Sequence, residues 1–312
     1  MERASAKWGR GHRLWIKRDD LTGSILSGNK VRKLEYIVAH AQDEGCDTLI
    51  TCGGLQSNHC RATAFVGAQL GMKVHLILRG EAPAQKDGNY LLDHLAGAAV
   101  SCYPARQYFR EQASLFTQWQ NHYAELGHKA LVIPTGGSDS IGVWGYISAC
   151  QELQLDFRSA GISKAHIVTA SGSGGTQAGL SAGAELLNLP ATVWGVNVCD
   201  DEQYFIDKVN EDIADWRSRY AGVPACTVTP KVLDGYVGPG YGEADPEIFD
   251  LIAVLAKLEG IVLDPVYTAK AFQGMVSELA LGRFEGVQDI VFMHTGGTFG
   301  MFPQRDGFRW PQ

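Results

Sequence analysis

The sequence lacks the features that mark disulfide-rich, zinc-binding and membrane-spanning proteins. Its seven cysteines form no C-x-x-C pair and stand at no zinc-ligand spacing from histidines. This spacing indicates that the cysteines are reduced thiols in an intracellular protein and that they form no metal site. The N-terminal segment holds no apolar signal sequence, and no run of about 18 apolar residues occurs anywhere in the chain. We therefore expect a soluble, cytoplasmic protein that does not enter a membrane.

The chain also lacks an excess of positive charge, internal repeats and low-complexity segments. Its formal net charge is -7, and the basic residues are scattered apart from a small cluster near Lys30. A nucleic acid is therefore not an expected partner, and this charge pattern favours a small ligand instead. The 312 residues, 45% of them hydrophobic, can bury a substantial core and usually form about two domains.

Short β-branched segments alternate with helical patterns along the chain, which is typical of a parallel α/β architecture. In the first predicted helix, the apolar residues of 34–41 recur at i, i+3, i+4 and i+7, and Gly45 provides a C-terminal stop. Lys30 then falls in the first turn of this helix. The predicted strands are residues 48–52, 73–78, 98–103, 130–134, 166–170, 192–198 and 289–294.

Four glycine-rich corners follow predicted strands, at residues 52–59, 134–140, 169–179 and 294–300. Ligands of open α/β sheets bind at the carboxyl ends of strands, where such loops meet the N-termini of helices. One glycine corner by itself is usually a matter of tight packing. Four corners that also carry serine, threonine, asparagine and histidine favour a ligand site.

The corner best suited to an anion is Ser-Gly-Ser-Gly-Gly-Thr at residues 171–176. Small residues allow backbone N–H groups to converge there, and a helix that opens at Gln177 adds partial positive charge, so a phosphate fits well. The residues that we expect to hold it are Gly172, Ser173, Gly174, Gly175 and Thr176.

Neither of the common nucleotide motifs is complete. The dinucleotide pattern G-x-G-x-x-G fails at Gln177, and the P-loop-like segment before Lys30 has Asn29 where glycine is needed and Val31 where serine or threonine is needed. A monophosphate cup with lysines elsewhere remains. That combination indicates pyridoxal 5′-phosphate (PLP), whose aldehyde needs a lysine.

Six ordered motifs resemble the PLP-dependent family of 1-aminocyclopropane-1-carboxylate (ACC) deaminases and D-cysteine desulfhydrases. They are SGNKVRKLEY, GGLQSNHCRATA, SGSGGTQAGL, GYVGPGYG, LDPVYTAKA and HTGG, and they cover about residues 14–302. The resemblance implies fold type II of the PLP enzymes, similar to the β subunit of tryptophan synthase, with two parallel-sheet domains and PLP in the cleft between them. We expect a large PLP-binding domain at 1–42 and 152–312, a small domain at 43–151 and, by resemblance alone, a homodimer.

The resemblance assigns roles to the two lysines near the start of the first helix. Lys30 matches the lysine that forms a Schiff base with PLP, and Lys33 matches a residue that helps to neutralise the phosphate. Their i, i+3 spacing places both on one face of a helix, which agrees with this division of roles.

The QSNH segment is the next matching element. The resemblance implies that Asn58 bonds the ring hydroxyl of PLP and that Ser57 lies by the substrate, where it can bind a carboxylate or take part in proton transfer. For His59 two interpretations stay open: an acid or base that titrates near neutral pH, or a structural histidine at the start of a helix.

Two tyrosines and two threonines complete the predicted site. Tyr241 and Tyr267 match family tyrosines near the ring and the substrate, where one can act as acid or base. Thr268 stands where ACC deaminases carry a glutamate that meets the pyridine nitrogen, and we expect it to contact the substrate. Thr295 is the better candidate for that nitrogen's partner. A carboxylate there would keep the nitrogen protonated and deepen the electron sink.

These residues favour a PLP-dependent lyase that converts D-cysteine, or a similar β-substituted amino acid, to pyruvate, ammonia and sulfide by α,β-elimination. The base is Lys30, Tyr241 or Tyr267. An ACC deaminase, a cysteate sulfo-lyase and a serine dehydratase or racemase would share the cofactor apparatus and are the alternatives among enzymes. A ligand-binding protein that keeps the fold without catalysis is the alternative outside them.

Overall fold

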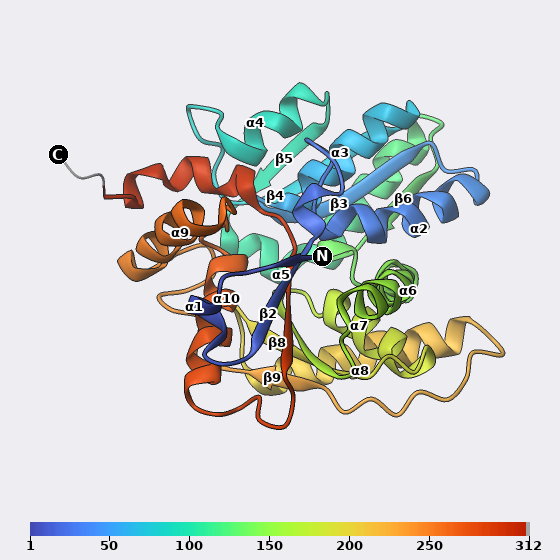
Figure 1. The fold of residues 1–312 in the computed structure, drawn as a ribbon. Helices are drawn as coiled ribbons and strands as arrows, with labels where there is room; N and C mark the ends of the chain where they lie inside the picture. Colours follow the sequence, from blue (N-terminus) through green and yellow to red (C-terminus); the bar gives the residue numbers. More distant parts are fainter. Residues whose placement is uncertain (310–312) are drawn as a thin grey trace.

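Two separate β-sheets form the framework of the protein in the computed structural model, which describes residues 1–309 (Figure 1). The larger sheet has the strand order β1 (Glu2–Arg3), β2 (Arg13–Arg18), β10 (Asp289–His294), β7 (Ala165–Ser171), β8 (Ala191–Asn197) and β9 (Lys231–Leu233). The smaller sheet has the order β5 (Ala99–Tyr103), β4 (Lys73–Arg79), β3 (Thr48–Gly54) and β6 (Ala130–Ile133). All neighbouring strands are parallel except β1 and β2.

The predicted α/β class and all seven predicted strands are confirmed, each within two residues at its ends. The predicted strands do not include β1, β2 and β9. β9 and β1 have three and two residues and are too short to show a period. Parallel pairing brings the carboxyl ends of neighbouring strands to one edge of each sheet, as the register of β10 on β2 shows from Asp289 opposite Arg13 to His294 opposite Arg18.

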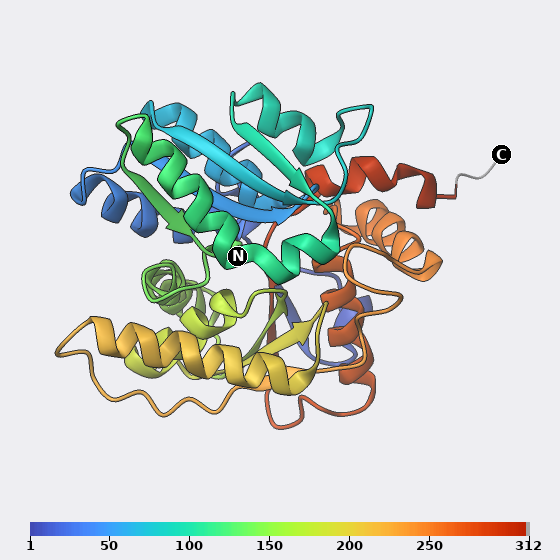
Figure 2. The ribbon, with the colours of Figure 1, turned by 180° about the vertical axis from the view of Figure 1, so that it is seen from behind.

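Helices cover both faces of the smaller sheet, because alternate residues of its strands point to opposite sides. Leu49 and Leu76 pack against α2 (Asn29–Asp43), α3 (Asn58–Leu70) and α4 (Gly88–Leu95), whereas Ile50 and Ile77 pack against α5 (Ala105–Glu125). Figure 2 shows α5 in front of this sheet when the molecule is seen from behind.

The larger sheet is covered in the same way. Ile167 and Val291 pack against α6 (Val143–Ala160) and α7 (Gly175–Leu186). Val168 and Phe292 pack on the other face against α1 (Ala6–Gly9), α9 (Pro246–Glu259) and α10 (Thr268–Ala280). The remaining helical elements are α8 (Glu202–Arg219), η1 (Asp19–Leu21), η2 (Thr135–Gly137) and η3 (Thr298–Gly307).

The chain begins the larger sheet with β1 and β2, forms the whole smaller sheet with β3 to β6, and then completes the larger one. This path is the basis on which we propose two interleaved domains, 1–42 with 152–312 and 43–151. The apolar face of α2, which includes Leu34 and Ile37, packs in the core of the smaller sheet. Within residues 1–309, no helix combines the length and the apolarity that crossing a membrane requires.

Candidate active site

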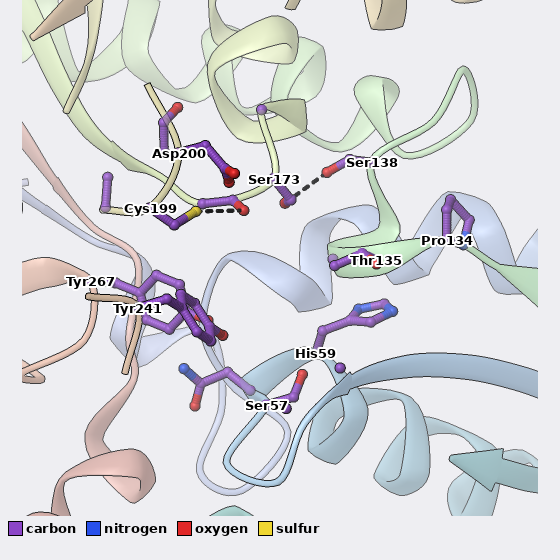
Figure 3. A pocket seen from close by; sticks show the side chains of 18 of the residues that line it. Ser57, His59, Pro134, Thr135, Ser138, Ser173, Cys199, Asp200, Tyr241 and Tyr267 are labelled. Carbon is purple, nitrogen blue, oxygen red and sulfur yellow. Dashed lines mark hydrogen bonds between the residues drawn. The ribbon is translucent and has the colours of Figure 1, made fainter. Parts of the chain in front are cut away.

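The four glycine-rich corners meet around a single cavity with a volume of about 820 Å³. They lie at the carboxyl ends of β3, β6, β7 and β10, so strands of both sheets contribute to its lining. Figure 3 shows Ser57 and His59 from the first corner, Thr135 and Ser138 from the second and Ser173 from the third. Residues of all four corners therefore line one cavity.

Lys30 stands in the first turn of α2, as predicted, and lines the cavity. The turn before it has Gly28 at φ 88°, where a Cβ atom would lie 2.7 Å from the carbonyl oxygen of Thr295. The backbone N–H of Asn29 donates to that same oxygen at 3.1 Å, which ties the lysine corner to the last glycine corner. Burial, together with the charge of Arg61, lowers the pKa of Lys30 to about 8. Much more of its amine is therefore neutral and nucleophilic near neutral pH than in an ordinary lysine.

The segment at residues 171–176 forms a cradle in which Gly172 and Gly174 have little room for a side chain. Gly174 has φ 81° and precedes α7, which begins at Gly175, two residues earlier than predicted. A Cβ atom on Gly172 would lie 3.0 Å from the Tyr267 ring, and one on Gly174 would lie 2.9 Å from Cγ of Lys208. The N–H of Gly175 donates to Ser138 Oγ. The other N–H groups in the first turn of α7, together with the helix dipole, suit this cradle to a phosphate.

Lys33 lies directly behind this cradle and is fully buried. Its Nζ donates to the carbonyl oxygen of Gly136 and to Ser138 Oγ, both at 3.1 Å, and a Cβ atom on Gly175 would lie 2.8 Å from it. Burial and the charge of Lys30 hold the pKa of Lys33 well below its ordinary value. A phosphate dianion bound in the cradle would favour the charged form of this lysine.

Asn58 is held so that its amide NH₂ group is available to a ligand. Its Oδ1 accepts a hydrogen bond from Asn89 Nδ2 at 2.9 Å and a longer one from Arg61 Nη1 at 3.4 Å. With the oxygen occupied, Nδ2 of Asn58 can donate into the cavity that this residue lines. Ser57 precedes it as the N-cap of α3 and accepts from the N–H of Cys60 at 3.2 Å.

The surroundings of His59 favour the structural interpretation of this residue. Its Nε2 lies 2.8 Å from Thr51 Oγ1, and that hydroxyl donates to the carbonyl oxygen of Ile133, so the imidazole must be the donor to it. Burial, followed by the charges of Lys30 and Lys33, keeps the pKa of His59 well below its ordinary value. The ring is therefore neutral near pH 7, with Nδ1 unprotonated.

Tyr241 and Tyr267 form a pair at the cavity wall, with their hydroxyls hydrogen-bonded and their ring centroids 5.9 Å apart (Figure 3). Burial raises the pKa of both phenols, so both are protonated near neutral pH. Each tyrosine is positioned by a buried charged residue. Asp264 accepts from the N–H of Tyr267 at 2.9 Å, and Lys270 donates to the carbonyl oxygens of Val237 and Gly240 in the loop that carries Tyr241.

Thr268 is buried behind the cavity wall and does not line the cavity. Thr295 does line the cavity. The hydroxyl of Thr268 donates to Asp264 Oδ1 at 2.7 Å and accepts from the N–H of Asp264 at 2.8 Å. The sequence predicted a substrate contact at Thr268. We assign it a positioning role instead, because its hydroxyl is committed to the residue that orients Tyr267.

Several cavity residues were missed by sequence reasoning. Arg79 ends β4 at the same edge as the glycine corners, so its place after a strand was an available signal. Tyr108 and Phe109 belong to α5, and Asn89, which orients Asn58, belongs to α4. Nothing in the sequence near these three residues points to a ligand.

PLP, the cofactor that the resemblance implies, fits the residues present. The glycine cradle has room for a phosphate, Lys30 offers an amine that is neutral far more often than that of an ordinary lysine, and the Nδ2 of Asn58 is free to meet a ring hydroxyl. Thr295 offers a hydroxyl at the opposite corner. Among residues 1–309, no group of three or more histidine, cysteine, aspartate or glutamate side chains is arranged to hold a metal ion.

Comparisons with known proteins agree with this geometry. The family described as "Pyridoxal-phosphate dependent enzyme" matches residues 2–296. The "Bifunctional D-cysteine desulfhydrase/1-aminocyclopropane-1-carboxylate deaminase, mitochondrial" of Arabidopsis thaliana is 42% identical over 306 residues, which cover 95% of this chain and 75% of that protein. A solved structure described as an "ACC deaminase homologue" has a TM-score of 0.89 at 36% identity and covers 98% of this chain and 91% of its own. Serine racemase from Dictyostelium discoideum shares the fold, with a TM-score of 0.66 at 15% identity, covering 95% and 92% of the two chains.

Proposed function

Because the chain belongs to the family of pyridoxal-phosphate dependent enzymes and has their type II fold, we propose that it catalyses α,β-elimination on D-cysteine or a similar β-substituted amino acid. The reaction takes one amino acid and one water to pyruvate, ammonium and hydrogen sulfide. The hydrogen on Cα and the sulfur substituent on Cβ are both lost from the substrate, and the electron pair of the Cβ–S bond leaves with the sulfur.

The observation that carries this proposal is the kind of polar group around the cavity. Asp200, beside the cradle, is the only carboxylate among the cavity-lining residues of the described chain, and Thr295 offers a hydroxyl in the last glycine corner. A hydroxyl holds a proton on the pyridine nitrogen less firmly than a carboxylate does. The electron sink is then weaker, and a thiolate leaves more readily from such a site than the ring carbon of ACC.

The bound cofactor supplies an electron-withdrawing ring that makes Cα of an attached amino acid acidic. We assign the binding of its phosphate to the cradle and Lys33, and the binding of its ring to Asn58 and Thr295. We assign the binding of the α-carboxylate to Ser57 and the start of α3, since a helix N-terminus attracts an anion.

Two groups can receive the Cα proton. Lys30 is the simpler choice, because its lowered pKa raises the fraction of neutral amine that can accept a proton near neutral pH. The hydroxyl pair of Tyr241 and Tyr267 is the other choice, and its raised pKa values suit it better to donating a proton than to accepting one. We therefore propose that Lys30 is the base that takes the Cα proton and that the tyrosine pair acts as a proton donor.

ACC deamination is the second candidate, because the Arabidopsis relative is named for both activities. Cysteate desulfonation and serine dehydration or racemisation would use the same cofactor residues. They differ from the proposed reaction only in what the rest of the cavity recognises.

Parallel pyruvate assays on D-cysteine, L-cysteine, D-serine and cysteate, with the 2-oxobutanoate assay for ACC, test the proposal. D-Cysteine should give the highest kcat/KM, and ACC should be slower by about tenfold for each 1.4 kcal/mol of lost stabilisation. Lys30→Ala is the control and should release no product. A higher kcat/KM for ACC would overturn the choice of reaction. If cysteate gave the highest kcat/KM, the proposed elimination would stand, but its leaving group would be a sulfonate and not a thiol.

A further inference from the structure

Arg79 presents a guanidinium group to the cavity without an anionic partner. It is half-buried at the end of β4, and within residues 1–309 it makes no hydrogen bond or ion pair to another side chain. Three aromatic rings surround it instead. Its Cζ lies 4.9 Å from the ring centroid of Phe109, 5.0 Å from that of Tyr241 and 5.9 Å from that of Tyr108. Stacking of this kind holds the group in place and leaves its N–H donors at the edge free.

The other cations of the cavity are already committed. Lys208 is hydrogen-bonded to Asp212, and Lys30 is the residue assigned to the cofactor. Lys33 lies behind the phosphate cradle. Arg79 is thus the positive charge of the lining that neither the fold nor the cofactor uses.

The position of Arg79 is on the substrate side of the cavity. It stands opposite Gly54 in the register of β3 and β4, and a Cβ atom on Gly54 would lie 3.8 Å from Arg79 Nη2 and 3.9 Å from Cε1 of Tyr241. The guanidinium therefore lies between the corner that carries Ser57 and the ring of Tyr241. Because the α-carboxylate is assigned to Ser57 and the start of α3, Arg79 would contact the side chain of the substrate.

We infer, building on the elimination proposed above, that Arg79 binds the negatively charged sulfur group on the β-carbon of the substrate, whether a thiolate or a sulfonate. The substrate class then extends from D-cysteine to amino acids with a β-sulfonate such as cysteate. A planar guanidinium can donate two parallel hydrogen bonds to sulfonate oxygens, and its charge stabilises the negative charge that a departing thiolate gains.

The same elimination accounts for both substrate types. In each case the Cα–H and Cβ–S bonds break, a Cα–Cβ double bond forms, and the sulfur leaves with the bonding electron pair. With one water, cysteine yields pyruvate, ammonium and hydrogen sulfide, and cysteate yields pyruvate, ammonium and hydrogen sulfite. No oxidant or reductant is needed.

Binding of unreactive analogues to the holoenzyme tests the role of Arg79 separately from turnover. 3-Sulfopropanoate carries the sulfonate, propanoate lacks it, and neither has an amino group that could react. By calorimetry, the wild-type protein should bind 3-sulfopropanoate about tenfold to a hundredfold more tightly than propanoate, the usual worth of a charge-assisted contact. Arg79→Gln should abolish that difference, and Arg79→Lys should retain part of it.

Arg106→Gln is the matched control, because Arg106 is an exposed arginine on α5 that does not line the cavity. It should keep the full preference for the sulfonate. Equal affinities of the wild-type protein for the two analogues would overturn the inference without any variant. A parallel loss of both affinities in Arg79→Gln would also overturn it, since Arg79 would then bind the α-carboxylate. Failure of the elimination itself would appear elsewhere, as the absence of pyruvate from every β-substituted amino acid.

Discussion

The Nζ of Lys33 donates a hydrogen bond to Ser138 Oγ at 3.1 Å. The same hydroxyl donates to Ser173 Oγ at 2.9 Å and accepts from the backbone N–H of Gly175 at 3.2 Å. A buried amine is thereby connected to the phosphate cradle through one serine. Lys33 acts on the cradle from behind, through this serine and through its charge, and not as a side chain that reaches into the cavity.

Lys33→Ala should weaken PLP binding about tenfold to a hundredfold, because it removes a charge-assisted contribution of about 1.5–3 kcal/mol. Titration of the apoprotein with PLP, followed by absorbance, measures this change. Lys257→Ala is the control, since Lys257 is exposed on α9. An unchanged PLP dissociation constant in Lys33→Ala would show that Lys33 does not contribute to phosphate binding.

The attachment of an aldehyde to Lys30 should depend on pH with a midpoint near 8, the pKa to which burial and the charge of Arg61 lower this amine. Only the neutral amine reacts, so the rate should fall about tenfold for each pH unit below the midpoint and level off above it. Pyridoxal is the suitable probe, because it lacks the phosphate that would itself add charge near Lys30. A rate that keeps rising towards pH 10.5, the ordinary lysine value, would contradict the lowered pKa. Lys30→Ala should show no attachment at any pH.

Ser57→Ala should keep the visible absorbance of the bound cofactor and raise KM or lower kcat, because its hydroxyl is assigned to the substrate. The variant also loses the cap of α3, which costs about 1 kcal/mol of the free energy of unfolding. Asp87→Ala removes the side-chain cap of α4, together with the ion pair of Asp87 to Arg305, away from the cavity lining. It should lower stability without changing the kinetics, so it separates the two effects. Loss of the cofactor in Ser57→Ala with normal kinetics after reconstitution would refute the role.

Thr268→Val should lower kcat with little change in KM, because Asp264 loses two hydrogen bonds and orients Tyr267 less well. The free energy of unfolding should fall by about 1–3 kcal/mol, the usual effect of leaving buried polar groups without a partner. Thr268→Ser keeps the hydroxyl and should restore most of both. If Thr268 instead touched the substrate, the valine variant would raise KM without a loss of stability. Steady-state kinetics and thermal unfolding of the two variants decide between these roles.

The order of the strands along the chain, the glycine corners and the place of Lys30 were determined by the sequence. Each depends on local physics: the period of apolar residues, the small size of glycine after a strand, and the opening of a helix directly after Gly28. The carboxyl ends of parallel strands must lie at one edge of a sheet, so the meeting of the corners also followed from the pattern.

The direction and depth of individual side chains were decided only by the tertiary structure. Asn89 lies 31 positions from Asn58, whose amide oxygen it holds, and the rings that surround Arg79 come from a helix and a loop distant in sequence. Thr268 follows a cavity tyrosine and still points to Asp264, because a buried carboxylate at the start of a helix attracts every nearby donor. The contacts of Asn58 and Arg79 join segments that only folding brings together, so no local pattern could have predicted them.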